Sequence, residues 1–451
     1  MNGIASLSDE DISRIVKSAH EMLDQYNLCD SCLGRQFAFL GRNITNSERG
    51  RALKLYLTLV ASELIEEGHK TEGIALLKTV ATHGNFSGAV ATLKKLGINV
   101  DPVQACYICE GFMEKIGTFA ELITKKLNNW EYRTFLIGSR IPEIVIDRED
   151  VLRAKFNIKY GESIKAELNR EIGKRITGLE KEVNFESPDI LAIINPITQD
   201  IEMHINPLFI FGRYRKLKRG ISQTRWICWN CEGRGCDECE GKGLRYEHSV
   251  EAFIAEPILK VAEGVEYKFH GAGREDIDAR MLGTGRPFVV EIKEPKKRFI
   301  DLKWIQEKIN ELAQGNVEVL DLQYSDRATI RNIKALAQIT EKTYRIIVET
   351  KDPVTLETIK HADEVLSGAV IQQRTPKRVV HRRADKLRIK KVYEFKTTPI
   401  GETKLEIIVR CQGGCYVKEL CTGDDGRTQP NLSDLLKTQV SVIELDVLHV
   451  A

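Results

Sequence analysis

Eight of the 11 cysteines form four Cys-x-x-Cys pairs, and this spacing constrains the fold more than any other feature of the sequence. The turn in such a pair lets both thiolates reach one metal ion, and two pairs complete the tetrahedral shell that structural zinc prefers. Each pair must therefore meet a second pair in the folded chain. The predicted ligands are Cys29, Cys32, Cys106, Cys109, Cys228, Cys231, Cys236 and Cys239.

The third and fourth pairs predict a self-contained zinc knuckle. They lie in the segment CWNCEGRGCDECEGKG, which uses the unit C-x-x-C-x-G-x-G twice, and its glycines permit tight chain reversals around a metal. The first and second pairs are far apart in sequence, so a shared site requires the fold to join them. A thioredoxin-like redox role is the alternative for these two, but neither pair follows a clear strand that opens a βαβ unit.

Length and composition indicate a globular protein of two or three domains, because 451 residues exceed one ordinary core and 42% of them are hydrophobic. The net charge is only +2, so a nucleic-acid surface must come from local clusters of basic residues. The N-terminal residues lack the basic and apolar regions of a signal peptide, and no apolar run approaches the roughly 20 residues that span a bilayer. We therefore expect a cytoplasmic protein without a membrane partner, whose cysteines are reduced.

The residue pattern changes from helical to mixed along the chain. Helices are expected from Ser8, a candidate N-cap, to about residue 23 and from about Asn46 onward. Strands at 134–138, 190–194 and 201–205 surround a helix at 163–176. Further helices are expected at 250–262 and 301–314, and further strands at 288–292, 317–324 and 344–349. The pattern predicts a multidomain α+β fold, and the alternation from residue 250 onward predicts one mixed sheet backed by helices in the last domain.

The segment GREDIDARMLGTGRPF, residues 273–288, places acids and arginines between glycines immediately before an apolar strand. A polar loop held by a buried strand is a common position for catalytic residues. The segment closely resembles the tRNA pseudouridine 54/55 synthase family of archaea and eukaryotes, in which an Arg-x-Asp turn presents the aspartate required for the reaction. The resemblance implies that Asp276 is the nucleophile and that Arg274 contacts the substrate.

Three further stretches resemble motifs of pseudouridine synthases and occur in the same order. Lys342-Thr343-Tyr344 is similar to a Lys-x-Tyr motif, which implies that Tyr344 stacks on the target base. The segment GCYVKEL, residues 414–420, is similar to Gly-x-Tyr-Ile-Arg-x-Leu, which implies that Tyr416 lines the pocket and Lys418 pairs with Asp276. Lysine replaces arginine here, so only its point charge carries over. The third stretch is a basic segment of the family, in which we expect Arg378, Arg382 and Arg383 to bind RNA.

The segment NFESPDILAIINP, a following strand and FGRYRKLKRG resemble a THUMP domain, an RNA-binding module of tRNA-modifying enzymes. The basic part of this stretch interleaves cations with Phe211 and Tyr214, as phosphate contact and base stacking require. The residues expected to bind RNA are Arg213, Arg215, Lys216 and Lys218. Together with the resemblance, the pattern predicts a helical zinc-binding region at 1–133, a THUMP-like domain at 134–225, the knuckle at 226–246 and a pseudouridine synthase domain with a mixed sheet at 247–451.

The resemblance implies an isomerase that converts uridine to pseudouridine at positions 54 and 55 of the tRNA T-loop. This reaction exchanges no redox equivalents, so we expect no organic cofactor and only one or two structural zinc ions. The sequence implies tRNA as the partner and no protein partner. Asp276 either attacks the sugar or deprotonates it towards a glycal, and both routes are open at this point.

Two other functions use many of the same features. A non-catalytic tRNA-binding scaffold would need the zinc modules and basic faces but not Asp276. A THUMP-containing methyltransferase or thiolation enzyme would need a glycine-rich nucleotide loop after a strand, whereas Gly283-Thr284-Gly285 precedes the expected strand. The sequence contains no Ser-Gly-Gly-x-Asp type of ATP loop.

Overall fold

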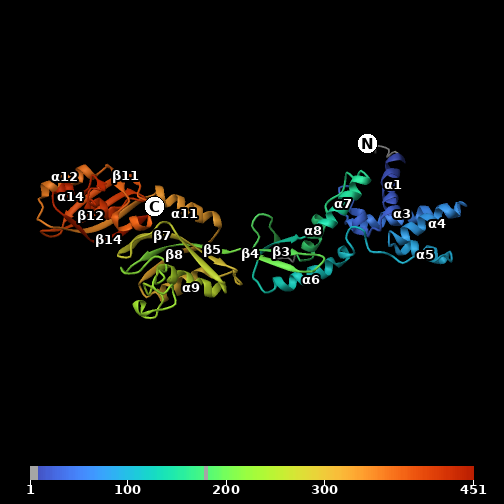
Figure 1. Ribbon diagram of the computed structural model, residues 1–451, viewed down its shortest axis with the longest axis horizontal. Coiled ribbons are helices and arrows are strands. Elements are labelled where there is room, and N and C mark those ends of the chain that lie inside the picture. The colour runs from blue at the N-terminus through green and yellow to red at the C-terminus, as the bar shows by residue number, and fades with distance from the viewer. Residues whose placement is uncertain (1–8, 177–180, 451) are drawn as a thin grey trace. The chain divides into compact units, whose positions relative to one another are not determined.

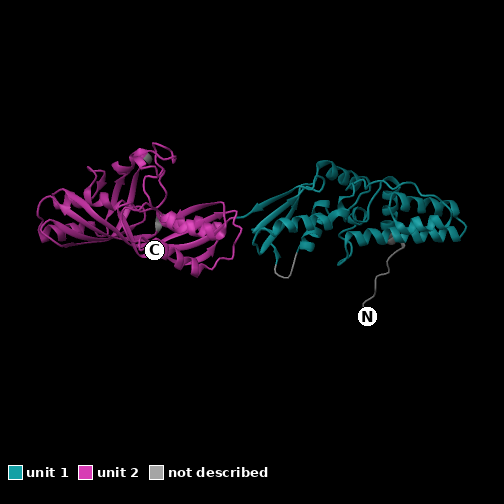
Figure 2. Ribbon diagram, turned by 90° about the horizontal axis from the view of Figure 1, so that it is seen from below, with its two compact units in different colours: residues 1–206 teal, residues 207–451 magenta. Residues whose placement is uncertain are grey.

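The computed structural model describes residues 9–176 and 181–450 and divides the chain into two compact units, residues 1–206 and 207–451 (Figure 2). The predicted cap Ser8 lies outside the described residues. Within the described part of the chain, no helix is both long and apolar enough to cross a membrane.

The first unit begins with helices, as the hydrophobic spacing predicts (Figure 1). The capping box of Thr45 and Glu48 fixes the start of the longest one, which the sequence placed at about Asn46. These elements are α1 (Asp9–Gln25), α2 (Asp30–Arg35), α3 (Asn46–Glu66), α4 (Lys70–Thr82), α5 (Ser87–Lys95), η1 (Phe112–Lys115) and α6 (Ile116–Leu127).

The remainder of the first unit is a small sheet with helices against it. Strands β1 (Thr134–Ser139) and β3 (Ile190–Ile194) pair in parallel, while β2 (Glu182–Val183) and β4 (Ile201–Ile205) form the two edges. The helices are α7 (Glu143–Lys155) and α8 (Ile164–Ile176). The alternating apolar residues of β1 and β3 are buried in one core with the helices of the same unit, which confirms the predicted strands.

The second unit is built on a ten-stranded mixed sheet, in which β14 and β7 pair in parallel and the other pairs are antiparallel. The order is β13-β10-β11-β12-β9-β14-β7-β5-β8, with β6 paired to β7. The strands are β5 (Leu208–Lys216), β6 (Glu266–Gly271), β7 (Ala279–Lys293), β8 (Val317–Ser325), β9 (Glu341–Thr350), β10 (Val370–Arg374), β11 (Leu387–Pro399), β12 (Lys404–Gln412), β13 (Thr428–Gln429) and β14 (Val440–Val450).

Helices cover this sheet and form two hydrophobic cores with it, one around β5, β7 and β8 and one around β9, β11 and β12 (Figure 1). The predicted helices at 250–262 and 301–314 are confirmed as α9 and α10. The helical elements are η2 (Asp237–Cys239), α9 (Val250–Ala262), α10 (Leu302–Ala313), α11 (Arg327–Ile339), α12 (Leu356–Leu366), η3 (Lys377–Arg382), α13 (Val417–Thr422) and α14 (Leu432–Leu436).

The position of β5 differs from the domain boundaries that the sequence suggested. The basic composition of residues 208–216 groups them with the preceding THUMP-like region, but β5 pairs with β7 and β8 in the large sheet. These ladders bury Ile210, Tyr214 and Lys216 on one face of the strand. The compact units therefore divide between Asn206 and Pro207 rather than after residue 225.

Candidate functional site

The loop between β6 and β7 carries Asp276, and buried contacts hold its backbone in place. The Nζ of Lys216 donates hydrogen bonds to the carbonyl oxygens of Asp276 at 3.0 Å and Ile277 at 3.1 Å. Gly273 enters the loop with φ of +84°, and a Cβ there would lie 3.0 Å from an Arg286 nitrogen. Glycine is therefore favoured at this position by its conformation, and a side chain there would also crowd Arg286.

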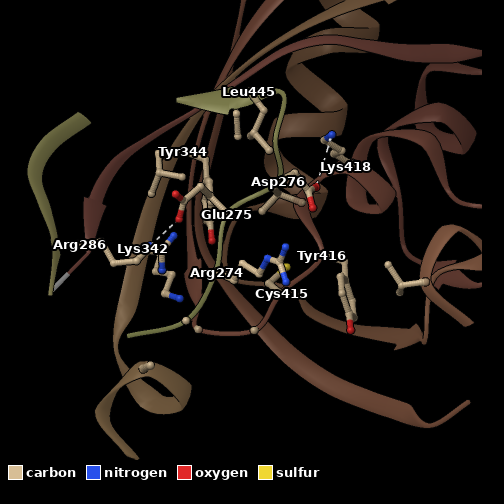
Figure 3. Close-up of a pocket in the computed structure, with 18 of the residues that line it drawn as sticks. Arg274, Glu275, Asp276, Arg286, Lys342, Tyr344, Cys415, Tyr416, Lys418 and Leu445 are labelled. Carbon is tan, nitrogen blue, oxygen red and sulfur yellow. Dashed lines mark ion pairs between the residues drawn. The ribbon is translucent and has the colours of Figure 1, made fainter. Parts of the chain in front are cut away.

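Adjacent acids in this loop have different environments. Glu275 is buried, where its carboxylate accepts a hydrogen bond from Tyr214 Oη at 2.9 Å and pairs with Arg286 Nε at 2.8 Å. The side chain of Asp276 is one-third exposed and lies on the other side, at a cavity (Figure 3). Glu275 thus anchors the loop to the sheet, while the carboxylate of Asp276 is accessible to a ligand.

Two cations pair with the carboxylate of Asp276. Arg378 Nη1 lies 3.1 Å from Oδ2, and Lys418 Nζ lies 3.4 Å from the same oxygen. Lys418 also contacts Asp278 at 2.7 Å, and Arg378 contacts Glu419 at 2.7 Å. Other acids therefore hold the two cations in position beside the Asp276 carboxylate.

Asp278 has a supporting role in this arrangement. Burial opposes its ionisation, but the hydrogen bond and charge of Lys418 outweigh that effect and lower the pKa of the Asp278 carboxyl. The Asp278 side chain is 68% exposed and pairs with Lys418. The neighbouring Arg280 does not contact it but pairs with Asp446 on β14.

The cavity above Asp276 has a volume of about 720 Å³ and two tyrosines in its wall. Tyr344 comes from β9, where burial raises the pKa of its hydroxyl. Tyr416 precedes α13, and its hydroxyl accepts a hydrogen bond from Arg383 at 3.1 Å. The other lining residues include Arg274, Lys342, Arg378, Lys390, Cys415, Val417, Lys418 and Leu445. Aromatic faces and cations around one carboxylate suit a planar, anionic ligand such as a nucleotide.

Lys342 adds a buried cation to the cavity wall. Burial, reinforced by the charge of Arg286, lowers the pKa of its ammonium to about 8. Arg274 lies in the same loop as Asp276, and its guanidinium carbon is 5.1 Å from the ring centroid of Trp226. The structure therefore brings Arg274, Tyr344, Tyr416 and Lys418 around Asp276, as the motifs predicted.

Both predicted groups of four cysteines assemble. In each group the four sulfur atoms lie within 4.8 Å of one another. The sulfur atoms of Cys29 and Cys109 are 3.7 Å apart, and those of Cys228 and Cys236 are 3.8 Å apart. A tetrahedral ion with sulfur ligands at about 2.3 Å requires sulfur atoms about 3.8 Å apart, so the residues fit such a metal.

Residues 119–195 match the family described as Pus10 THUMP domain, archaeal, and residues 209–451 match the family described as Pus10, C-terminal. The second match covers more than half of the chain and contains every residue that lines the cavity. The chain belongs to the Pus10 family. The family resemblance read from the catalytic segment is therefore confirmed.

Similar Pus10 proteins extend over nearly the whole chain. The tRNA pseudouridine synthase Pus10 of Methanocaldococcus jannaschii is 46% identical, covering 96% of this chain and 93% of that protein. Proteins of the same name from Thermofilum pendens and Methanothrix thermoacetophila are 42% and 40% identical. They cover 95% and 97% of this chain, and 94% and 95% of their own lengths.

The basic residues of β5 are engaged within this Pus10 chain. Arg213 donates to the carbonyl oxygen of Thr284 at 2.7 Å, and Arg215 pairs with Glu318 at 2.9 Å. Lys216 is fully buried, which corrects the prediction that it contacts RNA phosphate. Lys218 is exposed.

The basic segment after β10 contributes to the cavity itself. Arg378 and Arg383, predicted as RNA-binding residues, contact Asp276 and Tyr416. The side chain of Arg382 lies outside the described residues. Sequence reasoning missed Arg378 as a partner of Asp276, because 102 positions separate the two residues and the surrounding basic run hides it.

Proposed function

We propose that this Pus10 chain is a tRNA pseudouridine synthase that isomerises uridine with Asp276 as its nucleophile. The observation that supports this proposal is the position of the Asp276 carboxylate. It pairs with Arg378 and Lys418 and faces a cavity of about 720 Å³. The relatives that are similar over nearly the full length carry the name tRNA pseudouridine synthase Pus10. The motif resemblance adds positions 54 and 55 of the T-loop as the proposed target uridines.

The proposed reaction breaks the bond between N1 of uracil and C1′ of ribose and forms a bond from C1′ to C5. N1 gains a proton and C5 loses one, so the reaction needs no oxidant, reductant or second substrate. Asp276 either attacks C1′ or removes a proton from the sugar, and both routes require an ionised carboxylate. Arg378 and Lys418 lie at ion-pair distance from this carboxylate.

The target uridine must leave its stack, because C1′ cannot be reached inside a folded RNA loop. Tyr344 supplies an aromatic face in the cavity, and stacking on such a face recovers about 1 to 3 kcal/mol per base. The buried cation Lys342 and the paired Arg383 lie in the same wall, where they can contact phosphate.

We also propose that both cysteine groups hold structural zinc, because four thiolates in tetrahedral spacing are its preferred shell. Bound zinc would fix the fold of the knuckle and of the helical region, and no reaction step involves it. Since the proposed substrate is tRNA, we propose that the protein acts in the cytoplasm.

The test is a tritium-release assay with a tRNA transcript labelled at C5 of uridine. Asp276→Asn keeps the size of the side chain but removes its charge, so product formation should fall below detection while tRNA affinity stays close to wild type. Asp278→Asn is the matched control. It weakens the pairing with Lys418 and should keep measurable activity.

Full activity of Asp276→Asn would refute the nucleophile assignment. A wild-type protein that binds tRNA but releases no tritium from any uridine would support the non-catalytic scaffold instead.

A further inference from the structure

Aromatic and arginine side chains alternate on the surface of the zinc knuckle. The guanidinium of Arg245 lies 4.6 Å from the ring centroid of Trp229 and 5.9 Å from that of Trp226. Arg274 covers Trp226 in turn, at 5.1 Å. We name these four residues, Trp229, Arg245, Trp226 and Arg274, the Trp–Arg ladder.

The ladder is built by the knuckle and is exposed at its outer end. An antiparallel bridge between Ile227 and Leu244 places the two segments side by side, and the amide of Arg245 donates to the Trp226 carbonyl at 2.9 Å. Trp229 lies between the cysteines of one metal-binding pair, so a bound ion would fix its backbone. Its side chain is nevertheless 72% exposed.

An indole left in solvent on a rigid support contributes little to the stability of the knuckle, because most of its apolar surface stays in contact with water. Together with the adjoining guanidinium plane, the indole offers a face on which an unpaired base can stack. Among the described residues, Arg245 has no carboxylate partner, so its charge is offered together with the two rings. The nearby acids Glu240 and Glu247 pair with Lys242 instead.

The inner end of the ladder reaches the proposed catalytic loop. Arg274 precedes Asp276 by two positions and lines the same cavity. A chain of stacking surfaces therefore leads from the knuckle to the site where the target uridine would be held. Nucleotides next to a flipped uridine are themselves unstacked, and they need partners of this type.

We propose that the Trp–Arg ladder is a stacking site for an unpaired nucleobase of the RNA substrate, next to the target uridine. Trp229 and Trp226 supply planar faces, and Arg245 supplies a plane that also carries a positive charge for the adjoining phosphate. The site requires single-stranded RNA rather than a duplex, because paired bases do not expose their faces. This inference rests on the proposed function for the location of the target uridine.

The experiment uses the full-length, metal-loaded protein and two readouts. The chain contains four tryptophans, so Trp130→Phe combined with Trp304→Phe leaves only the two knuckle indoles. Stacking of a base on an indole quenches its fluorescence, so titration with the tRNA transcript should quench this emission, whereas a fully paired RNA of similar length should not.

The second readout is the steady-state kinetics of Trp229→Ala. Loss of one stacked base should raise KM by roughly 5- to 150-fold, with the effect falling on KM rather than on kcat. Trp229→Phe should restore most of the affinity. Trp304→Ala is the matched control, because Trp304 is also exposed, at 51%, but lies on α10 away from the ladder.

An unchanged KM in Trp229→Ala, with the metal content of wild type, would overturn the proposal, as would equal quenching by paired RNA. The quenching titration is repeated in the Asp276→Asn background, so it does not depend on catalysis. If the proposed function is wrong, the wild-type protein will have no isomerase activity. If only the stacking proposal is wrong, the protein will be active but tRNA will not quench the fluorescence of Trp226 and Trp229.

Discussion

Replacing Lys216 by methionine tests whether a buried ammonium holds the loop that carries Asp276. Its Nζ donates to the carbonyl oxygens of Ile221, Asp276 and Ile277 at 2.9, 3.0 and 3.1 Å. Methionine has a similar length and no donor, so the three hydrogen bonds from Lys216 are lost, although Asp276 and Ile277 each keep one from the backbone amides of Ala279 and Gly220. The backbone at Asp276 and Ile277 is then less firmly held.

The magnitude follows from two opposing terms. Three hydrogen bonds from a charged donor contribute about 6 kcal/mol, taking about 2 kcal/mol for each. Burial lowers the pKa of Lys216 from 10.5 to about 8, so removing the buried charge returns about 3 kcal/mol. The net loss is about 3 kcal/mol in the free energy of unfolding, which corresponds to a fall of roughly 6 to 12 °C in the Tm of a unit of this size.

The sign of the pH dependence is also defined. The folded pKa of Lys216 lies below its unfolded value, so the unfolded chain holds the extra proton between about pH 8 and 10.5. Between about pH 8 and 10.5, Lys216 therefore makes the free energy of unfolding of the wild-type protein rise with pH. This contribution to the pH dependence is absent in Lys216→Met. Below pH 8 the difference in stability between the two proteins is constant.

The assays are thermal unfolding and tritium release, each with Lys218→Met as the control. Lys218 lies two positions away and is exposed, so its replacement should leave Tm within about 1 °C, in line with the small effects of surface substitutions. Displacement of Asp276 by about 1 Å should reduce kcat by about 100-fold in Lys216→Met. A variant that keeps wild-type Tm and kcat would show that Lys216 does not hold the loop that carries Asp276.

Four further outcomes are expected. Elemental analysis should find two zinc ions per chain, with Cys29→Ser and Cys228→Ser each losing one; a single ion in wild type would remove one of the proposed sites. Arg382, Arg383 and Lys386 are replaced together by alanine, and the logarithm of the tRNA binding constant is plotted against the logarithm of the salt concentration. The slope should become shallower by about 0.7 to 0.9 for each phosphate that is no longer neutralised. An unchanged slope would show that this segment does not contact RNA. Because burial lowers the pKa of Lys342 to about 8, tRNA affinity should weaken as the pH rises through 8, and Lys342→Met should lack this contribution to the pH profile. Arg378→Ala should lower kcat more than Lys418→Ala, because Arg378 lies closer to the Asp276 carboxylate, at 3.1 against 3.4 Å. Single-turnover rates of the two variants measure the difference. A larger loss in Lys418→Ala would show that Lys418 is the more important cation.

Local patterns in the sequence predicted the helices α9 and α10, the strands β8 and β9 and part of β7, because each of these carries its own periodicity, whereas the other strands of the large sheet were not predicted. The strand expected at 288–292 is longer in the structure, extending from Ala279 to Lys293. The glycines at 283 and 285 made its first half look like a loop. At Gly283 a Cβ would lie 1.6 Å from the Leu448 carbonyl oxygen, so the close approach of β14 explains the glycine.

The motifs predicted the pairing of Lys418 with Asp276 but not that of Arg378 with Asp276. Contacts such as Arg378 with Asp276 arise from the fold and leave no local signal. Lys216 is different, since its misassignment was avoidable. On a strand, alternate residues share one face, so Lys216 falls on the side of Ile210 and Tyr214 rather than with Arg213 and Arg215. The alternation was present in the sequence, but the basic composition of the run obscured it.

Arg35 has a consequence for how the first unit can be divided. Its guanidinium is fully buried and donates to Cys32 Sγ at 3.3 Å, while it pairs with Glu149 on α7 at 2.7 Å and Glu167 on α8 at 2.8 Å. A fragment that starts near residue 119, where the THUMP match begins, would bury two carboxylates without their cation. We therefore expect this fragment to be less stable than the whole first unit, and domain exchange between family members to succeed best with a boundary at residue 206.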